Sequence, residues 1–70
     1  METINIRLAK RLKALRKKYN LTQEELAEAA GIDYKHLQDL ESKNPSAPTL
    51  TTLEKLAKAL KLSVSELLDF

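Results

Sequence analysis

Residues 21–41 read LTQEELAEAAGIDYKHLQDLE, and this stretch decides the fold. Thr22 and Glu25 have the spacing of a capping box, in which a hydroxyl and a carboxylate each accept from the other residue's N–H. A helix that begins here ends at Gly31, the only glycine of the chain, which supplies the positive φ that closes a helix. Asp33 is a strong N-cap and predicts a second helix over residues 34–42. The stretch therefore predicts two short helices joined by a turn of about three residues.

The segment before this stretch predicts another helix, over roughly residues 3–18. Its apolar residues recur every three or four positions: Ile4, Leu8, Leu12, Leu15 and Tyr19. Asn20 follows where helices often end in a left-handed residue.

The segment after it predicts a loop and two more helices. Residues 43–48, KNPSAP, have the composition of a loop. Thr49 caps a helix whose expected inward face is Leu50, Leu53, Leu56, Ala57 and Leu60. Lys61 and Leu62 form a link, and Ser63 with Glu66 forms a second capping box for a short helix that extends through Leu67 to Leu68, or alternatively to Phe70.

Composition supports one all-α domain. The chain has 70 residues, no cysteine and one histidine, so we expect no disulfide, no metal site and no other cofactor. No catalytic motif is recognisable, which argues against an enzyme and against a small-molecule substrate. No apolar run approaches the roughly 18 residues of a membrane span. We therefore expect a cytoplasmic protein that does not bind membranes.

The charge is unevenly distributed although the net charge is only +2. Residues 3–18 hold seven of the twelve basic side chains, whereas the next helix carries Glu24, Glu25 and Glu28. A basic face is typical of nucleic-acid or anionic-membrane binding, and equally of an ordinary solvated helix.

The two helices around Gly31 have helix-turn-helix spacing. In that motif the second helix lies in the DNA major groove, and the N-terminus of the first faces a phosphate. The sequence also resembles the Xre-type (lambda-repressor-like) helix-turn-helix family across essentially its whole length. The matching segments are LTQEELA (21–27), Gly31-Ile32, Leu40-Glu41, PTLTTL (48–53) and LAKAL (56–60).

The resemblance implies one compact five-helix domain over residues 1–70, with the motif at 22–42. It implies a homodimer on a palindromic double-stranded DNA operator. The DNA-binding residues carried over by position are Thr22, Gln23, Tyr34, Lys35, His36, Gln38, Asp39, Lys43, Asn44 and Thr49.

Each expected contact has a chemical reason. The Gln23 amide is suited to a phosphate oxygen. Lys35 pairs with guanine, Gln38 with adenine and Asp39 with cytosine, while Tyr34 contacts a sugar or a thymine methyl. The alternative is a solvated face, with Lys35 and Asp39 as an i,i+4 ion pair. His36 is expected near the DNA backbone or half-buried in its helix.

Two structural roles also follow from the resemblance. Arg16 and Glu41 are expected to form a partly buried ion pair between the first helix and the end of the third. Val64, Leu67, Leu68 and Phe70 are expected at a dimer interface, or alternatively they cap the core of the monomer.

The chain departs from the family pattern in its recognition helix, which carries Asp33, Asp39 and Glu41 against one basic residue, Lys35. Ser42 also stands where relatives commonly have glycine. We expect a sequence-specific DNA-binding transcriptional regulator, a repressor or controller that reads the major groove with residues 34–42. The alternative is an antitoxin-like or protein-interaction module that reuses the fold.

Overall fold

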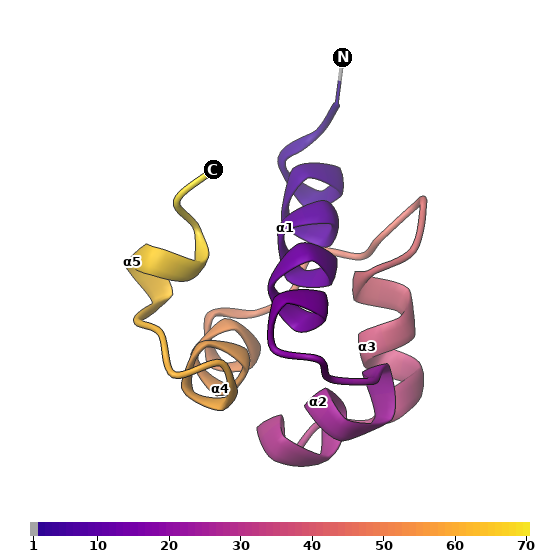
Figure 1. The fold of residues 1–70 in the computed structure, drawn as a ribbon. Coiled ribbons are helices and arrows are strands. Elements are labelled where there is room, and N and C mark those ends of the chain that lie inside the picture. Colours follow the sequence, from indigo (N-terminus) through magenta and orange to yellow (C-terminus); the bar gives the residue numbers. More distant parts are fainter. Residues whose placement is uncertain (1) are drawn as a thin grey trace.

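Five α-helices pack around one core in the computed structural model. The model describes residues 2–70 and contains no strand in that range. Figure 1 shows α1 between α3 on one side and α4 with α5 on the other, while α2 packs against both α3 and α4. The all-α, five-helix prediction is confirmed. The helices are α1 (Ile4–Lys18), α2 (Gln23–Ala30), α3 (Tyr34–Leu40), α4 (Leu50–Ala59) and α5 (Val64–Leu67).

Every helix begins at a side-chain cap. The caps are Thr3, Thr22, Asp33, Thr49 and Ser63, and each side chain accepts from a backbone N–H of the first turn. Both predicted capping boxes are present, at Thr22 with Glu25 and at Ser63 with Glu66. These caps satisfy amides that a helix start otherwise leaves without partners, which explains how such short helices have sharp boundaries.

Three residues in left-handed conformation end helices. Gly31 has φ 69° and Asn20 has φ 56°, as the sequence predicts. Lys61, with φ 59°, is not foreseen. The N–H of Leu62 donates to the Ala57 carbonyl at 2.8 Å, which closes α4 and brings the half-buried Leu62 onto the core.

Leucine and alanine side chains fill the core. The stripe of α1 buries Leu8, Leu12 and Leu15, and every other helix adds at least one buried residue. Full burial of one leucine contributes roughly 1.5–3 kcal/mol. The fully buried leucines therefore supply most of the apolar stabilisation: Leu12, Leu26, Leu37, Leu40, Leu56, Leu60 and Leu67.

The prediction that Leu50 faces inward is wrong, because its side chain is 79% exposed. Leu50 is the first residue of α4. Side chains on a helix tilt toward its N-terminus, so this one points past the start of α4. The apolar pattern of α4 therefore begins at Leu50, whereas the buried part of the helix begins at Leu53.

Two helices end earlier than predicted. The third ends at Leu40 and not at Ser42, because the N–H and hydroxyl of Ser42 both donate to the Asp39 carbonyl, at 3.1 and 2.6 Å. The fifth ends at Leu67 and does not reach Phe70. Arg11 of α1 donates to the carbonyls of Glu66 and Leu67 and thereby satisfies this helix end.

Candidate nucleic-acid interface

A buried ion pair joins α1 to the end of α3. Arg16 Nε lies 2.9 Å from one Glu41 oxygen and 3.2 Å from the other, and Nη2 donates at 3.0 Å. Arg16 Nη1 also donates to the Leu21 carbonyl at 2.8 Å, just before α2. The two side chains are 11% and 1% exposed. One guanidinium therefore fixes the relative positions of α1, the start of α2 and the end of α3.

The same carboxylate holds the side chain at the start of α2. Gln23 Nε2 donates to Glu41 Oε1 at 3.3 Å. An amide nitrogen carries two hydrogens, so this bond orients Gln23 and leaves a second N–H for a ligand. At the residue before Gln23, the Thr22 N–H donates to Glu25 Oε1 at 2.9 Å, and the Thr22 hydroxyl accepts from the Glu25 N–H at 3.1 Å. The start of α2 is therefore held by hydrogen bonds within its own first turn and by a hydrogen bond to Glu41 at the end of α3.

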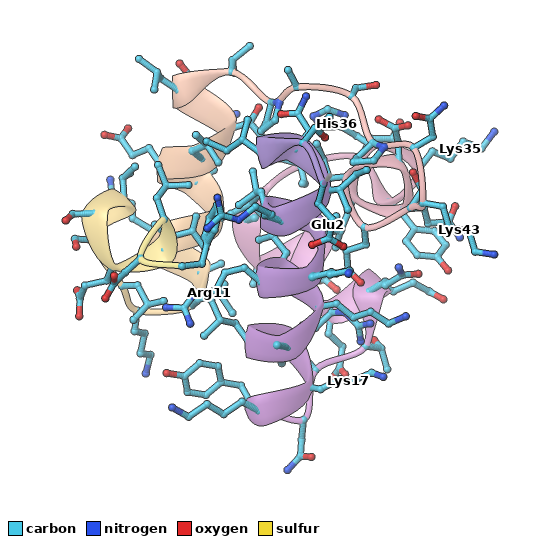
Figure 2. The ribbon with its side chains drawn as sticks, turned by 90° about the horizontal axis from the view of Figure 1, so that it is seen from above. Glu2, Arg11, Lys17, Lys35, His36 and Lys43 are labelled. Atoms are coloured by element: carbon cyan, nitrogen blue, oxygen red, sulfur yellow. The ribbon has the colours of Figure 1, made fainter. Side chains whose placement is uncertain are left out.

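The outer face of α3 is exposed at Tyr34, Lys35 and Gln38, while Leu37 and Leu40 bury the opposite face. Asp33 Oδ1 accepts from the Lys35 N–H at 3.0 Å, which caps the helix at the point where this face begins. Figure 2 shows Lys35 and Lys43 on the α3 side of the molecule and Arg11 on the α5 side. The three polar side chains at positions i, i+1 and i+4 thus form one accessible surface.

Asp39 holds the loop that follows α3. Its Oδ2 accepts from the Ser46 backbone N–H at 3.2 Å. Hydrogen bonds from the hydroxyl and the backbone N–H of Ser46 lower the pKa of this carboxyl below its ordinary value. Within residues 2–70 no salt bridge joins Asp39 to Lys35. His36, one turn before, is half-buried.

Three more predicted contact residues lie between α3 and α4. Lys43 and Asn44 are exposed. The Thr49 hydroxyl accepts from the Thr52 N–H and donates to the Thr52 hydroxyl, both at 3.1 Å. Thr49 is therefore engaged in starting α4.

Comparison with known proteins identifies this arrangement of helices. Residues 12–67 match a family model described as helix-turn-helix. The chain belongs to the helix-turn-helix family. Over 58 residues it is 43% identical to the immunity repressor protein of Bacillus phage phi105, a match that spans 83% of this chain and 40% of that repressor.

Solved structures agree with this assignment. The restriction-modification controller protein C.AhdI from Aeromonas hydrophila superimposes with a TM-score of 0.84 and is 32% identical, over 90% of this chain and 94% of that one. The biofilm master regulator SinR of Bacillus subtilis, solved in complex with DNA, has a TM-score of 0.81 and 35% identity, over 89% of this chain and 98% of that one. The lambda-repressor-like fold is thereby confirmed.

The helix-turn-helix domain holds its C-terminus through two arginines of α1 that the sequence reasoning missed. Arg11 Nη2 donates to the Glu66 carbonyl at 2.9 Å, and Arg7 Nη2 donates to the Phe70 carbonyl at 3.0 Å. The Arg7 guanidinium also lies 5.1 Å from the centre of the Phe70 ring. The sequence does carry a signal for this role: Arg7 and Arg11 stand four positions apart in a helix whose other basic residues are mostly lysines. Arginine offers several donors in a fixed geometry and is therefore suited to binding backbone carbonyls. Part of the basic face of α1 is therefore structural.

The expected dimer interface needs one correction. Leu67 is completely buried in the core of this helix-turn-helix domain, so its assignment to an interface is wrong. Val64 and Leu67 are three positions apart and share the inward face of α5, and Leu67 is the deeper of the two. Val64 is half-buried, and Leu68 and Phe70 are 37% and 38% exposed.

Other kinds of site are not apparent in the part of the chain that the structure describes. No group of three His, Asp or Glu side chains in residues 2–70 is placed to hold a metal ion. No helix within that range combines the length and apolar character needed to cross a bilayer.

Proposed function

We propose that this domain is a sequence-specific double-stranded DNA-binding transcriptional regulator that reads the major groove with α3. One observation carries the proposal: the exposed face of α3 and the amide of Gln23 are held in one rigid frame by Arg16 and Glu41. Base readout by a helix requires a fixed register against the phosphates, and this frame supplies it. Proteins that bind DNA, SinR among them, share the fold.

The side chains suggest how the readout is divided. Lys35 donates to guanine O6 and N7, Gln38 pairs with adenine, and Tyr34 contacts a thymine methyl or a sugar. Each good base contact contributes about 1–3 kcal/mol of discrimination. Asp39 acts first as the anchor of the loop between α3 and α4, because the Ser46 N–H donates to its Oδ2. Acceptance from a cytosine amino group is a second role of the same carboxylate.

The backbone contacts surround that surface. Gln23 offers its second amide hydrogen to a phosphate, with Thr22 beside it at the helix start. Lys43 and Asn44 lie in the loop that follows α3 and contact the adjacent phosphates. His36 and Thr49 add further contacts to the DNA backbone. None of these groups distinguishes bases, so together they set affinity and register.

The regulator acts as a homodimer on a palindromic operator. Leu68 and Phe70 remain exposed at the end of the chain, and Val64 is half-buried; exposed apolar side chains of this kind are suited to a two-fold contact. Such a dimer places the two α3 helices on half-sites about 34 Å apart. Similarity to an immunity repressor and a controller protein supports a repressor or controller in the bacterial cytoplasm.

Duplex binding measured by fluorescence anisotropy tests the proposal. We expect the affinity to fall steeply between 50 and 200 mM salt, as phosphate contacts require. Lys35→Ala should weaken binding to the preferred site, whereas Lys58→Ala, an equal charge change on the exposed surface of α4, should leave it nearly unchanged. If no duplex binds micromolar wild-type protein at low salt, the regulator assignment fails and the protein-interaction alternative stands.

A further inference from the structure

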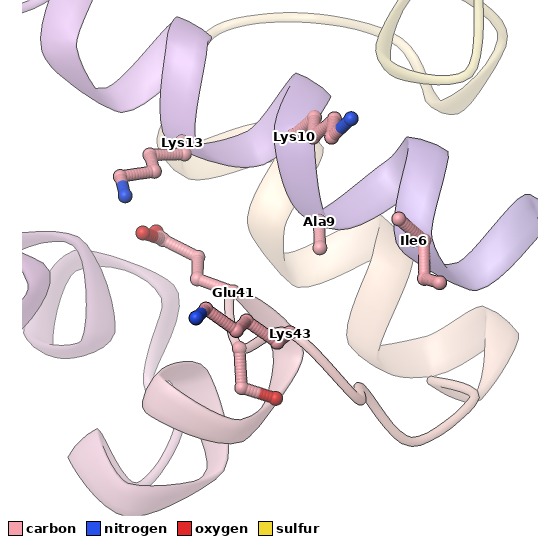
Figure 3. A pocket seen from close by; sticks show the side chains of 7 residues that line it. Ile6, Ala9, Lys10, Lys13, Glu41 and Lys43 are labelled. Atoms are coloured by element: carbon pink, nitrogen blue, oxygen red, sulfur yellow. The ribbon is translucent and has the colours of Figure 1, made fainter. Parts of the chain in front are cut away.

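A hollow between α1 and the end of α3 is lined by three lysines. Its volume is about 220 Å³, and its lining residues are Ile6, Ala9, Lys10, Lys13, Glu41, Ser42 and Lys43. Figure 3 shows Lys13 reaching from α1, and Lys43 from the segment after α3, toward the side of the hollow where Glu41 lies. We call this hollow the lysine pocket.

The only carboxylate that lines the lysine pocket is already neutralised. Glu41 accepts from Arg16 through both oxygens and from Gln23 through Oε1, and its side chain is 1% exposed. Its charge therefore does not satisfy the lysines. Neither Lys13 nor Lys43 has a salt-bridge partner within residues 2–70, and Lys10 pairs with the exposed Glu2. An exposed pair of that kind is weak and is readily exchanged for a better anion.

The floor of the pocket is apolar, since Ala9 is buried and Ile6 is half-buried. Charges beside an apolar surface interact more strongly than charges in open water. The ammonium groups of Lys13 and Lys43, each with three donors, extend toward the Glu41 side of this concave space (Figure 3), which is large enough for one tetrahedral anion. Lys10 also lines the space, and its ammonium group pairs with Glu2.

We infer that the lysine pocket binds a phosphate group, with Lys13 and Lys43 as its principal donors and Lys10 as a third. The group has two possible sources with the same chemistry. One is a phosphodiester of the duplex held by α3, which would extend the footprint onto α1 and which rests on the proposed function. The other is a free phosphate-bearing small molecule that acts as an effector.

The first arm of the test measures duplex affinity against salt for the wild type, Lys13→Gln and Lys55→Gln. Lys55 is a matched control, because it is an exposed lysine on α4 that takes the same charge change. If the group is a DNA phosphate, Lys13→Gln makes the slope of log affinity against log salt shallower by about 1. Lys55→Gln leaves that slope unchanged.

The second arm titrates the free protein with inorganic phosphate and with pyrophosphate, using sodium chloride at equal ionic strength as reference. Backbone amide shifts are followed by NMR. If a free ligand is the source, the amides of Ala9, Ser42 and Lys43 shift saturably in the wild type. The shifts are then absent in Lys13→Gln and retained in Lys55→Gln.

The two arms separate this inference from the proposed function. If the wild type binds no duplex, the regulator assignment fails. The phosphate titration alone then decides whether the lysine pocket binds a phosphate group. The inference is overturned if Lys13→Gln matches Lys55→Gln in salt slope and phosphate shifts the pocket amides no more than chloride does. Because Lys13 is exposed, both variants should fold, and circular dichroism verifies that they do.

Discussion

Replacing Glu41 with leucine should destabilise the domain severely, and replacing Arg16 as well should restore most of the loss. Glu41→Leu removes every partner of the Arg16 Nε and Nη2 donors, while the Arg16 side chain is only 11% exposed. Breaking a buried ion pair on one side leaves a charge without compensation and costs about 3–5 kcal/mol. The apolar pair Arg16→Met with Glu41→Leu leaves no charge and is expected to lie within about 1 kcal/mol of wild type.

These magnitudes are large for so small a domain. At roughly 0.05–0.15 kcal/mol per residue, a chain of 70 residues has a total stability of about 3.5–10 kcal/mol. Each single variant therefore loses about 30% of the stability or more. A loss of about 3 kcal/mol lowers Tm by roughly 12–24 °C in a domain of this size.

Urea denaturation followed by circular dichroism measures the four proteins of this cycle. The double variant should be far more stable than the sum of the two single losses implies. Two results refute the reasoning. One is a loss below about 0.5 kcal/mol in either single variant, which is typical of surface substitutions. The other is a double variant whose loss equals the sum, because the two side chains would then not depend on each other.

Three further predictions concern the turn, the loop and the phosphate contact. Gly31→Ala should cost about 1–2 kcal/mol, because φ is +69° and nothing within 4 Å opposes an added Cβ, so backbone strain is the whole cost. Gly31→Asn should cost less in the same urea assay, and equal losses would contradict this account. The pKa of Asp39 is lowered in the folded protein, so its stabilising contribution is complete above the ordinary aspartate pKa of about 3.9 and disappears as the pH falls through the lower folded value. Urea midpoints of wild type and Asp39→Asn should accordingly differ near neutrality and converge in acid, and a constant difference would exclude this linkage. Gln23→Ala should weaken binding to all duplexes alike and make the salt slope shallower by about 1; a changed base preference in a binding-site selection would show instead that Gln23 reads sequence.

Local signals made much of the fold predictable. Caps and turns act between residues at most four or five positions apart, so Thr22 with Glu25, Gly31 and Asp33 predict their helix boundaries without knowledge of the rest. The apolar stripe of α1 likewise identifies its buried face. Periodicity does not reveal where the neighbouring helices end, however, and this is why Leu50 was misassigned to the core.

Contacts between distant residues account for what the sequence could not reveal about the site. The bond from Gln23 to Glu41 spans 18 positions, and those from Arg11 to α5 span more than 50. Nothing local distinguishes Arg11 from an exposed helix residue until α5 packs beside it. In the same way, Asp39 has the appearance of a base-reading side chain until the loop brings the N–H of Ser46 to its carboxylate.

Selection of bound duplexes from a random pool tests the central claim most directly, because it asks whether the chain prefers one DNA sequence over others. The wild type at low salt should enrich a two-fold symmetric site with half-sites about 10 base pairs apart. Lys35→Ala should enrich a site whose preference is relaxed at one symmetric pair of positions. A pool that remains random after repeated rounds, with no duplex retained, would contradict the claim that α3 reads DNA.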